Sequence, residues 1–365
     1  MSPKWSINGR LSAVKNQFLL DPDVVFLNHG SFGACPRPVF EEYQRLQLEL
    51  ERQPVEFLAL ERRFAALLDD ARRELARHVG AGDGNLAFAT NTSSALNTVV
   101  RSLDLGPGDE VLLGDAEYGG LEIMWEHVRR RTGVTIERRP FDELEPGRRT
   151  KVVFCSHVEW TTGRVNDLAP LVAAARGRGA LTIVDGAHAP GQIDLDLDAL
   201  GADVYAGNCH KWLCAPKGSA FLYVRPELQD QIVPDVVSWD FVDGAAFHER
   251  HRWQGTRDPS AYLAVPAAIR FQAEHDWPSV RERCHALLAT VELPFEPLTD
   301  EYVQMRGFRV DHPDPPALKQ WLYDEHRIEV PVFETPHGWV LRVSVQAYND
   351  SDDLAALVSA LEQRA

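Results

Sequence analysis

The chain has 365 residues, 44% of them hydrophobic, and a formal net charge of -16. This length can bury a large core, and we expect one large and one small domain. The acidic charge argues against nucleic acid or an anionic membrane surface as the main partner, because both bind basic surfaces. No stretch approaches the roughly 20 consecutive apolar residues of a membrane span.

The N-terminal segment and the cysteines indicate the cellular compartment in which the protein is expected. Residues 1–16 lack the apolar centre of a secretion signal. The cysteines are odd in number and show no paired framework; they are Cys35, Cys155, Cys209, Cys214 and Cys284. Both features favour a cytoplasmic protein. No second pair of ligands accompanies Cys209 and Cys214, so no metal site is predicted.

From residue 85 onwards, short apolar runs alternate with amphipathic helical stretches. Strands are predicted at residues 86–89, 110–113, 152–155, 181–184 and 204–206, and helices at 94–103, 121–131 and 168–176. This alternation predicts a largely parallel sheet with helices on both faces. Ligands of such sheets bind beyond the carboxyl ends of the strands, so the residues that follow each strand are the functional candidates.

The flanking regions follow other patterns. Residues 39–78 carry apolar residues at helical spacing, with a break expected at Pro54. The C-terminal part predicts a small α+β domain, with strands at 330–333 and 339–345 and helices at 316–325 and 352–363. We expect three regions: 1–30, packing with the small domain; 31–285, the large domain; and 286–365, the small domain.

Several polar or aromatic residues follow the predicted strands. Thr90 to Ser94 begins a helix, where free backbone N–H groups bind anions; ordinary capping by Thr92 or Ser93 is the alternative. Tyr118, which precedes two glycines, is either a core aromatic or a platform for a planar ligand. His157 follows the third strand, where it can donate or accept a hydrogen bond.

Asp185 and Lys211 follow the last two of these strands. A buried Asp185 needs a cationic partner, either the protonated ring nitrogen of a cofactor or an arginine. Lys211 lies in a partly apolar turn, which favours the neutral and nucleophilic amine. An anion site, an aromatic face, a carboxylate and an amine at one sheet edge are the groups that hold pyridoxal 5'-phosphate.

Seven motifs span nearly the whole chain: Asn28–Gly30, Thr90–Asn97, Glu117–Gly119, Val184–His188, His210–Trp212, Trp253–Pro259 and Arg342–Asn349. In order and spacing, the chain resembles the fold-type I pyridoxal-phosphate enzymes of the class V aminotransferase family, close to its isopenicillin N epimerase-like branch. The resemblance implies a large domain with a mostly parallel seven-stranded sheet, a small α+β C-terminal domain and pyridoxal 5'-phosphate as the cofactor.

The resemblance also implies a role for each residue around the cofactor ring. Lys211 would form a Schiff base with the cofactor and then move protons at the substrate Cα. Asp185 would pair with the pyridine nitrogen. Tyr118 would stack on the ring, although many relatives use histidine near this place, and His157 and His188 would contact its O3' oxygen.

Further residues would hold the cofactor phosphate. The resemblance assigns this role to Thr92, Ser93 and His210 within one chain. Gly255 and Thr256 resemble the segment that reaches the phosphate from a second subunit. This implies a homodimer with shared sites.

Arg342 matches the position at which the family binds the substrate α-carboxylate. A bidentate clamp is favoured there over a strand arginine paired to a surface acid. The clamp would restrict the substrate to an α-amino acid or a close analogue. Asn28 and His29 are expected to line the same pocket.

Several reactions share proton removal from Cα. An epimerase or racemase, acting through an external aldimine and a carbanion, is favoured. A β-eliminating C–S lyase and an aminotransferase are the alternatives, and a non-catalytic binding protein with this fold is the alternative of another class. An epimerase needs a second acid/base on the face opposite Lys211. The candidates are His29, His157, Tyr118 and Glu159.

Two features bear on the reaction and the substrate. Cysteine desulfurases of this family use a cysteine in the C-terminal part. This chain has none between Met305 and Arg342, and Cys284 falls in a predicted helix, which disfavours desulfuration through a persulfide. The tryptophans near motif positions are candidates for the side-chain pocket; they are Trp160, Trp212, Trp239 and Trp253.

Overall fold

The computed structural model describes residues 14–364, so the first 13 residues of the predicted N-terminal segment lie outside the described range. The chain divides into two compact units. The large unit comprises residues 39–160 and 166–269. The small unit comprises the described residues up to 38, residues 161–165, and residues from 270 onwards. The domain boundaries drawn from the sequence stay a prediction.

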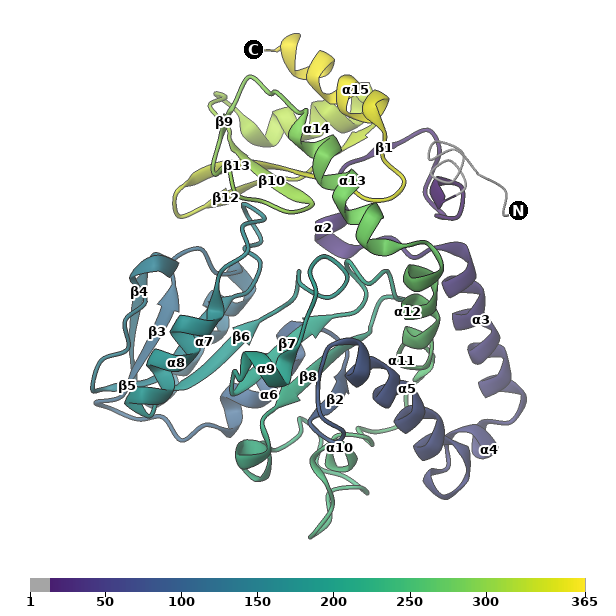
Figure 1. Cartoon of the computed structure of the whole chain (residues 1–365), viewed down its shortest axis with the longest axis vertical. Coiled ribbons are helices and arrows are strands. Elements are labelled where there is room, and N and C mark those ends of the chain that lie inside the picture. Colours follow the sequence, from purple (N-terminus) through teal and green to yellow (C-terminus); the bar gives the residue numbers. More distant parts are fainter. Residues whose placement is uncertain (1–13, 365) are drawn as a thin grey trace, which may run out of the picture. The chain divides into compact units, whose positions relative to one another are not determined.

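A seven-stranded sheet forms the centre of the large unit (Figure 1), in the order β2-β8-β7-β6-β5-β3-β4. Only β8 runs against its neighbours, since it pairs antiparallel with both β2 and β7. The predicted mostly parallel seven-stranded sheet is therefore confirmed. Its strands are β2 Leu86–Ala89, β3 Glu110–Gly114, β4 Thr135–Arg139, β5 Thr150–Ser156, β6 Leu181–Asp185, β7 Val204–Asn208 and β8 Ala220–Val224.

Helices cover both faces of this sheet (Figure 1). Right-handed crossovers place α6 and α7 on one face and α8 and α9 on the other, because the chain crosses the sheet in opposite directions in its two halves. The α-helices from residue 37 to residue 274 are α3 Arg37–Arg52, α4 Pro54–Leu58, α5 Ala65–His78, α6 Thr92–Ser102, α7 Gly119–Thr132, α8 Leu168–Arg178, α9 Leu197–Leu200, α10 Phe247–Arg250, α11 Ser260–Leu263 and α12 Val265–Glu274.

The helical region before the sheet is interrupted at the predicted place. Gln53 does not have a helical backbone conformation, and Pro54 opens α4 as its first residue. Proline suits that position because its missing N–H would be unpaired there in any case. A short π-helical turn, Leu60–Phe64, then leads into α5.

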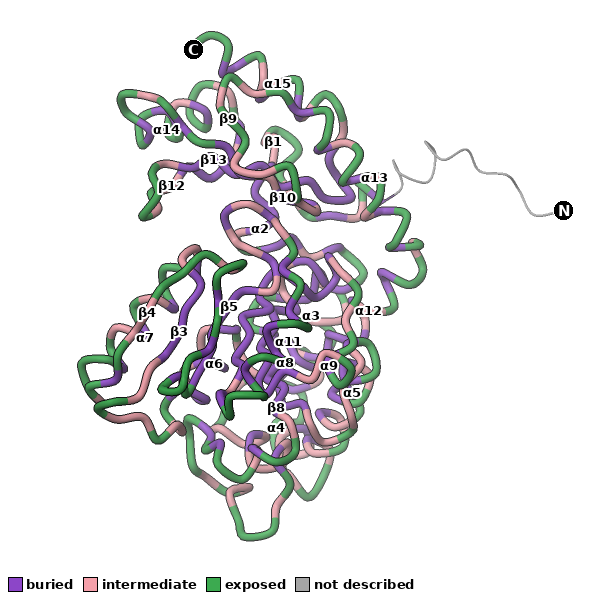
Figure 2. The backbone as a smooth tube through the Cα atoms, turned by 60° about the vertical axis from the view of Figure 1, so that its left-hand side comes forward, coloured by how far each residue is buried: buried purple, intermediate pink, exposed green. Residues whose placement is uncertain are grey.

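The core of the large unit lies between the sheet and its helices. Both β7 and β8 are buried over their whole length, and most strands are in the colour of buried residues in Figure 2. Trp125 of α7 packs edge-on against Phe154 of β5, with ring centroids 5.6 Å apart. Each large apolar side chain buried here contributes about 1.5–3 kcal/mol. The strand ends that carry the polar motifs are therefore held on a rigid frame.

The small unit contains two sheets. One is antiparallel, in the order β12-β13-β10-β9, and the other is the parallel pair β1–β11. The elements are β1 Val25–Phe26, α2 His29–Phe32, α13 Trp277–Ala289, β9 Glu296–Pro297, β10 Met305–Arg309, α14 Pro315–His326, β11 Ile328–Glu329, β12 Val332–Thr335, β13 Gly338–Ser344 and α15 Ser351–Glu362. The Ser344 N–H donates to the Leu27 carbonyl and joins the end of β13 to the chain after β1.

Two further features concern the whole described range. None of the helices between residues 14 and 364 combines the length and the apolar character required to cross a bilayer. All five cysteines lie in this range and are free thiols.

Candidate active site

Lys211 lies in the turn after β7, at the sheet edge formed by the carboxyl ends of the parallel strands. Its Nζ is 3.0 Å from Nε2 of His188, which follows β6. The other ring nitrogen of His188, Nδ1, accepts a hydrogen bond from the indole N–H of Trp212 at 3.2 Å. We call Lys211, His188 and Trp212 the lysine cluster.

A close backbone contact holds the lysine cluster together. Gly191 has a φ of +86°, and a Cβ at this position would lie 2.3 Å from the carbonyl oxygen of Trp212. Only glycine therefore lets residues 186–191 lie directly against the backbone of Trp212. The Gln192 side-chain amide also donates to the His188 carbonyl at 2.7 Å. These contacts fix the backbone that carries the imidazole.

Asp185 ends β6 and is only 5% exposed. Its Oδ1 accepts the Ala187 N–H at 2.8 Å. Burial raises the pKa of Asp185, although the backbone hydrogen bond and the positive charge of Lys211 act in the opposite direction. Asp185 forms no ion pair with any described residue, so an arginine is not its cationic partner. A protonated ring nitrogen would fit this carboxylate.

His157 follows β5 and makes hydrogen bonds to residues of β6 and β7. Its N–H donates to the Asp185 carbonyl at 2.9 Å, and its Nδ1 is 2.8 Å from the hydroxyl of Tyr205. Burial lowers the pKa of His157 to about 4, so the ring is neutral near pH 7. The sequence did not indicate Tyr205 as a partner, because it belongs to the apolar run of β7.

Thr92 opens α6 but does not cap it. Asn91 is the cap, accepting the Ser94 N–H at 2.8 Å, so the alternative of capping by Thr92 or Ser93 is wrong. The Thr92 N–H donates to Asn208 Oδ1 at 2.9 Å. Its buried hydroxyl has no hydrogen-bond partner in the described part of the chain. A phosphate at this helix start would supply the missing acceptor.

His210 precedes the cofactor lysine predicted from the sequence. Its Nδ1–H donates to the Ser219 carbonyl at 2.8 Å, which leaves Nε2 as an acceptor in the neutral ring. Burial lowers the pKa of His210 to about 4. Donation from Nε2 to a phosphate therefore requires a proton on this nitrogen, and the charge of the phosphate would favour it.

Tyr118 lies just before α7 and is 45% exposed, so it is not a core aromatic. Its ring packs edge-on against that of Trp160, with centroids 5.7 Å apart. One face of the Tyr118 ring is therefore not packed against the core. This agrees with a platform for a planar ligand.

Glu117, beside Tyr118, is a buried acid whose importance the sequence did not reveal. Its Oε1 accepts the Ser156 N–H at 3.0 Å, and its Oε2 is 2.6 Å from the Ser156 hydroxyl. Burial raises the pKa of Glu117 to about 8. A Cβ at Gly114 would lie 2.3 Å from Oε1, so a glycine is needed where β3 ends. This bond ties the loop of Tyr118 to the end of β5.

Gly255 and Thr256 lie between α10 and α11, and a Cβ on Gly255 would meet nothing within 4 Å.

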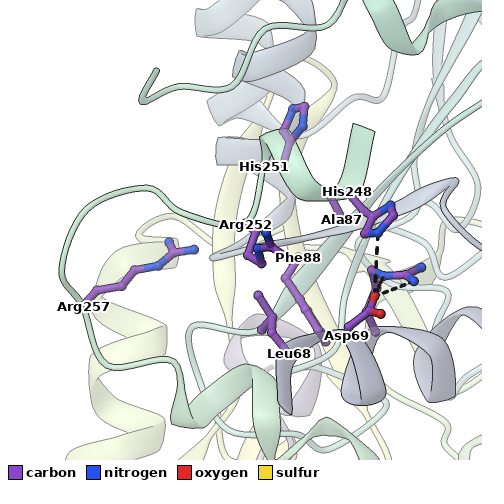
Figure 3. Close-up of a pocket in the computed structure, with 9 residues that line it drawn as sticks. Leu68, Asp69, Ala87, Phe88, His248, His251, Arg252 and Arg257 are labelled. Atoms are coloured by element: carbon purple, nitrogen blue, oxygen red, sulfur yellow. Dashed lines mark hydrogen bonds and ion pairs between the residues drawn. The ribbon is translucent and has the colours of Figure 1, made fainter. Parts of the chain in front are cut away.

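A pocket elsewhere in the large unit is lined by residues of α5, of β2, of α10 and of the segment after α10, including His251 and Arg257 (Figure 3). Its volume of about 20 Å³ admits a single water. It is too small for a cofactor. Residues 14–364 contain no group of three His, Cys, Asp or Glu side chains arranged as metal ligands.

Arg342 lies on β13 of the small unit and is only 3% exposed, so it is not a surface arginine. Its Nη2 donates to the Ser31 hydroxyl at 3.1 Å. Burial lowers the pKa of Arg342 to about 10. A Cβ at Gly30 would lie 3.2 Å from Nη2 and 2.6 Å from the Met305 sulfur, so Gly30 allows this close approach.

Asn28 and His29 begin the same short segment of the small unit. The Asn28 amide donates to Glu329 at 2.9 Å, and its Oδ1 accepts the Ser31 hydroxyl at 2.5 Å. Ser31 thus links Asn28 to the arginine on β13. His29 is fully buried, and its Nδ1 is 2.9 Å from the Tyr348 hydroxyl.

Known proteins resemble the chain over most of its length. Residues 33–305 match the class V aminotransferase family. The chain is 37% identical to the isopenicillin N epimerase of Streptomyces clavuligerus, over 95% of this chain and 96% of the relative. It is 28% identical to a probable chloroplastic L-cysteine desulfhydrase of Arabidopsis thaliana, over 93% and 83% of the two chains.

The fold has solved counterparts as well. A complex of a cystine C–S lyase with cysteine persulfide superposes with a TM-score of 0.81 at 24% identity, covering 93% of this chain and 97% of the other. The sheet and the groups at its carboxyl edge define a fold-type I pyridoxal-phosphate enzyme. More narrowly, the chain belongs to the class V aminotransferase family, and pyridoxal 5'-phosphate is its cofactor. The family, fold and cofactor predicted from the sequence are confirmed.

Proposed function

We propose that the chain is an epimerase that acts at the Cα of an α-amino acid. The observation that carries this proposal is the 37% identity to an isopenicillin N epimerase over nearly the full length of both chains. Isopenicillin N is accordingly the first substrate to test. The five free thiols support a cytoplasmic location.

The residues at the sheet edge fit the cofactor. In the described part of the chain, Thr92 carries a buried hydroxyl without a hydrogen-bond partner, and Asp185 a buried carboxylate that forms no ion pair. The bound cofactor would withdraw electrons from the substrate Cα and so acidify its proton. Lys211 would bond to the cofactor and then move protons on one face of the substrate Cα.

The other large-unit residues would hold and tune the cofactor. Asp185 would keep the ring nitrogen protonated, and Tyr118 would cover one ring face. His157 and His188 would hydrogen-bond to O3'. The Trp212 indole holds Nδ1 of His188 and so fixes the direction of the ring, while Nε2, which lies beside Lys211, would turn to O3' once Lys211 is bonded to the cofactor.

Phosphate binding would use three residues of one chain and two of another. We propose Thr92, Ser93 and His210 for the first group, and Gly255 and Thr256 of a partner copy for the second. A homodimer is supported by an exposed apolar stretch ahead of the second group, because large exposed apolar patches mark interfaces. This stretch comprises Val236, Val237, Trp239 and Val242, and the Trp239 side chain is 78% exposed.

Arg342 would bind the substrate carboxylate, with Asn28 and His29 lining the pocket. A buried guanidinium is costly to maintain, and a bidentate carboxylate offsets that cost. The hydrogen bonds through Ser31 connect Arg342 to Asn28. Substrates without an α-carboxylate should therefore bind poorly.

Epimerisation requires proton transfer on both faces of Cα. Of the four candidates for the second acid/base, Tyr118 and His157 can be distinguished from each other by their surroundings. His157 is neutral and lies within hydrogen-bond distance of the Tyr205 hydroxyl, which suits a relay. Tyr118 is half exposed and needs no relay to reach solvent. His29 and Glu159 stay candidates.

A β-eliminating C–S lyase is the second candidate function, favoured by the 28% identity to a probable L-cysteine desulfhydrase. A desulfurase is disfavoured, because no cysteine lies between Met305 and Arg342 and the Cys284 thiol is buried. Burial raises the pKa of Cys284 to about 12, which keeps the thiol protonated and unreactive. A non-catalytic protein would not require the set of Lys211, Asp185 and Arg342.

The decisive experiment follows Cα in deuterated water. The cofactor-loaded protein is incubated with isopenicillin N and with a panel of L-amino acids, each followed by mass and by chiral chromatography. We expect deuterium at Cα together with loss of chirality. Pyruvate, ammonia and hydrogen sulfide from cysteine would instead establish the lyase, and a keto acid with aminated cofactor would establish the transaminase. Unchanged substrates throughout would contradict catalysis at Cα.

A further inference from the structure

The lysine cluster contains a hydrogen bond of fixed direction. The indole nitrogen of Trp212 is a donor only, and it lies 3.2 Å from Nδ1 of His188. Nδ1 must therefore accept. Both side chains are buried, with Trp212 at 0% and His188 at 4% exposure, so water does not compete readily for this bond.

The direction of this bond determines where His188 carries its proton. A neutral imidazole has one N–H, and with Nδ1 accepting, this proton is on Nε2. Nε2 lies 3.0 Å from Nζ of Lys211. At that contact the imidazole donates and the amine accepts. An ammonium on Lys211 would place two donors against each other.

We propose that Trp212 is a positioning residue that fixes the tautomer of His188 and thereby holds Lys211 as a neutral amine. Its effect passes through His188. The inference rests on the proposed role of Lys211 as the cofactor lysine.

The charges near Lys211 show why the His188 N–H is needed to keep the amine neutral. The titratable groups that act on Lys211 from adjoining segments include Asp185, His188 and His210. The carboxylate of Asp185 favours an ammonium on Lys211, while the neutral ring of His210 has little electrostatic effect on the charge state of Lys211. The His188 N–H opposes Asp185, because it hydrogen-bonds only to the lone pair of the amine.

A neutral amine serves both tasks proposed for Lys211. Its lone pair is needed to bond to the cofactor and, later, to take the proton from Cα. When that proton arrives, the new ammonium faces the His188 N–H and is destabilised. The ammonium therefore gives up this proton readily, either to carbon on the Lys211 face or to solvent, and the neutral amine is restored. Each transfer moves one proton, and the second acid/base acts on the opposite face of Cα.

The tautomer can be read directly by NMR. Full-length protein freed of cofactor is prepared with ¹⁵N-labelled histidine, and His188 is assigned by difference against His188→Gln. Long-range ¹⁵N–¹H spectra distinguish a protonated nitrogen from an accepting one. We expect a protonated Nε2 and an accepting Nδ1 in the unmodified protein. A proton on Nδ1, or a charged ring at neutral pH, would overturn the proposal without any Trp212 variant.

A matched pair of variants tests the effect on Lys211. Trp212→Phe removes the indole N–H and keeps an aromatic ring. Trp125→Phe is the control, because Trp125 is also fully buried in the large unit and its indole nitrogen has no partner there. The readout is the pH dependence of pyridoxal attachment to Lys211, trapped with borohydride and located by peptide mass spectrometry.

We expect Trp212→Phe to move the half-maximal pH of attachment upwards by about one unit, the shift that corresponds to one hydrogen bond of about 1.4 kcal/mol. Attachment at neutral pH then slows about tenfold, and Trp125→Phe stays at the unmodified value. An unmoved profile in a folded Trp212→Phe variant would overturn the proposal. If the trapped lysine is not Lys211, the proposed function fails, whereas the His188 tautomer is measured without cofactor.

Discussion

At the residue scale, replacing the Thr92 hydroxyl distinguishes a structural role of this side chain from a role in cofactor binding. It is buried and unpaired, so removing it costs the fold nothing. Thr92→Val should leave the stability of the cofactor-free protein unchanged or raise it. Cofactor affinity should fall tenfold or more, because a hydrogen bond to a charged phosphate contributes about 1.5–3 kcal/mol.

Thr182→Val is the matched control for this prediction. The Thr182 hydroxyl on β6 is also buried and without a partner among the described residues. Its replacement should have the same effect on stability and none on cofactor affinity, measured by equilibrium titration. Equal affinities for the two variants would remove Thr92 from the phosphate site.

Glu117 makes a prediction about pH. Its pKa is 4.5 in the unfolded chain and about 8 in the folded one, so the folded state binds the extra proton between these values. The stability from Glu117 is fully present below pH 4.5 and is lost as the pH rises through about 8. The difference in unfolding free energy between unmodified protein and Glu117→Gln should fall by at most about 1.4 kcal/mol per pH unit in this window. Urea unfolding of cofactor-free protein measures it, and a pH-independent difference would refute it.

The sequence revealed site residues whose chemistry follows from their place after a strand. Asp185 and Lys211 are of this kind, because Asp185 directly follows an apolar run and Lys211 lies in the turn after the next one. Tyr205, Asn208 and Glu117 were not recognised as partners, since their hydrogen bonds reach residues far along the chain. Only the fold brings these side chains together.

At the element scale, the contact between two loops supports the lysine cluster. Gly191→Ala should destabilise the protein by about 1–3 kcal/mol, because alanine is strained at a φ of +86° and its Cβ meets the Trp212 carbonyl. It should also impair cofactor attachment, since His188 and Lys211 are displaced from each other. Thermal unfolding and pyridoxal trapping measure the two effects.

Gly177→Ala is the matched control at this scale. Gly177 lies within α8, and a Cβ there would meet nothing within 4 Å. Alanine should stabilise this helix by about 0.5–1 kcal/mol and leave cofactor attachment unchanged. A Gly191→Ala protein as stable as Gly177→Ala would show that the loop contact is dispensable.

The helices and strands that were predicted correctly from the sequence are those with a clear hydrophobic periodicity. β2 has the predicted bounds, and α6, α7 and α8 differ from their predicted bounds by at most two residues at either end. β4 was missed because it is a half-exposed edge strand with three charged residues among five. The one-turn helix α2 was not predicted, because four residues are too few to show a helical period.

At the scale of the whole molecule, the proposed shared site predicts complementation. Lys211→Ala and Thr256→Ala each damage one contribution to every site. A mixed dimer has one site with both defects and one site with neither. Mixing the two variants under subunit exchange should therefore restore activity above the sum of the separate proteins. No gain in a demonstrated mixed dimer would place Thr256 outside the partner's site.

The central claim is that the chain is organised around Lys211 as the cofactor lysine. The direct measurement is borohydride reduction of the purified, cofactor-loaded protein, followed by digestion and mass spectrometry of every lysine peptide. We predict the reduced pyridoxyl group on Lys211 alone, with the label and the visible absorbance band both lost in Lys211→Ala. A label on another lysine, or an undiminished band in folded Lys211→Ala, would contradict the account.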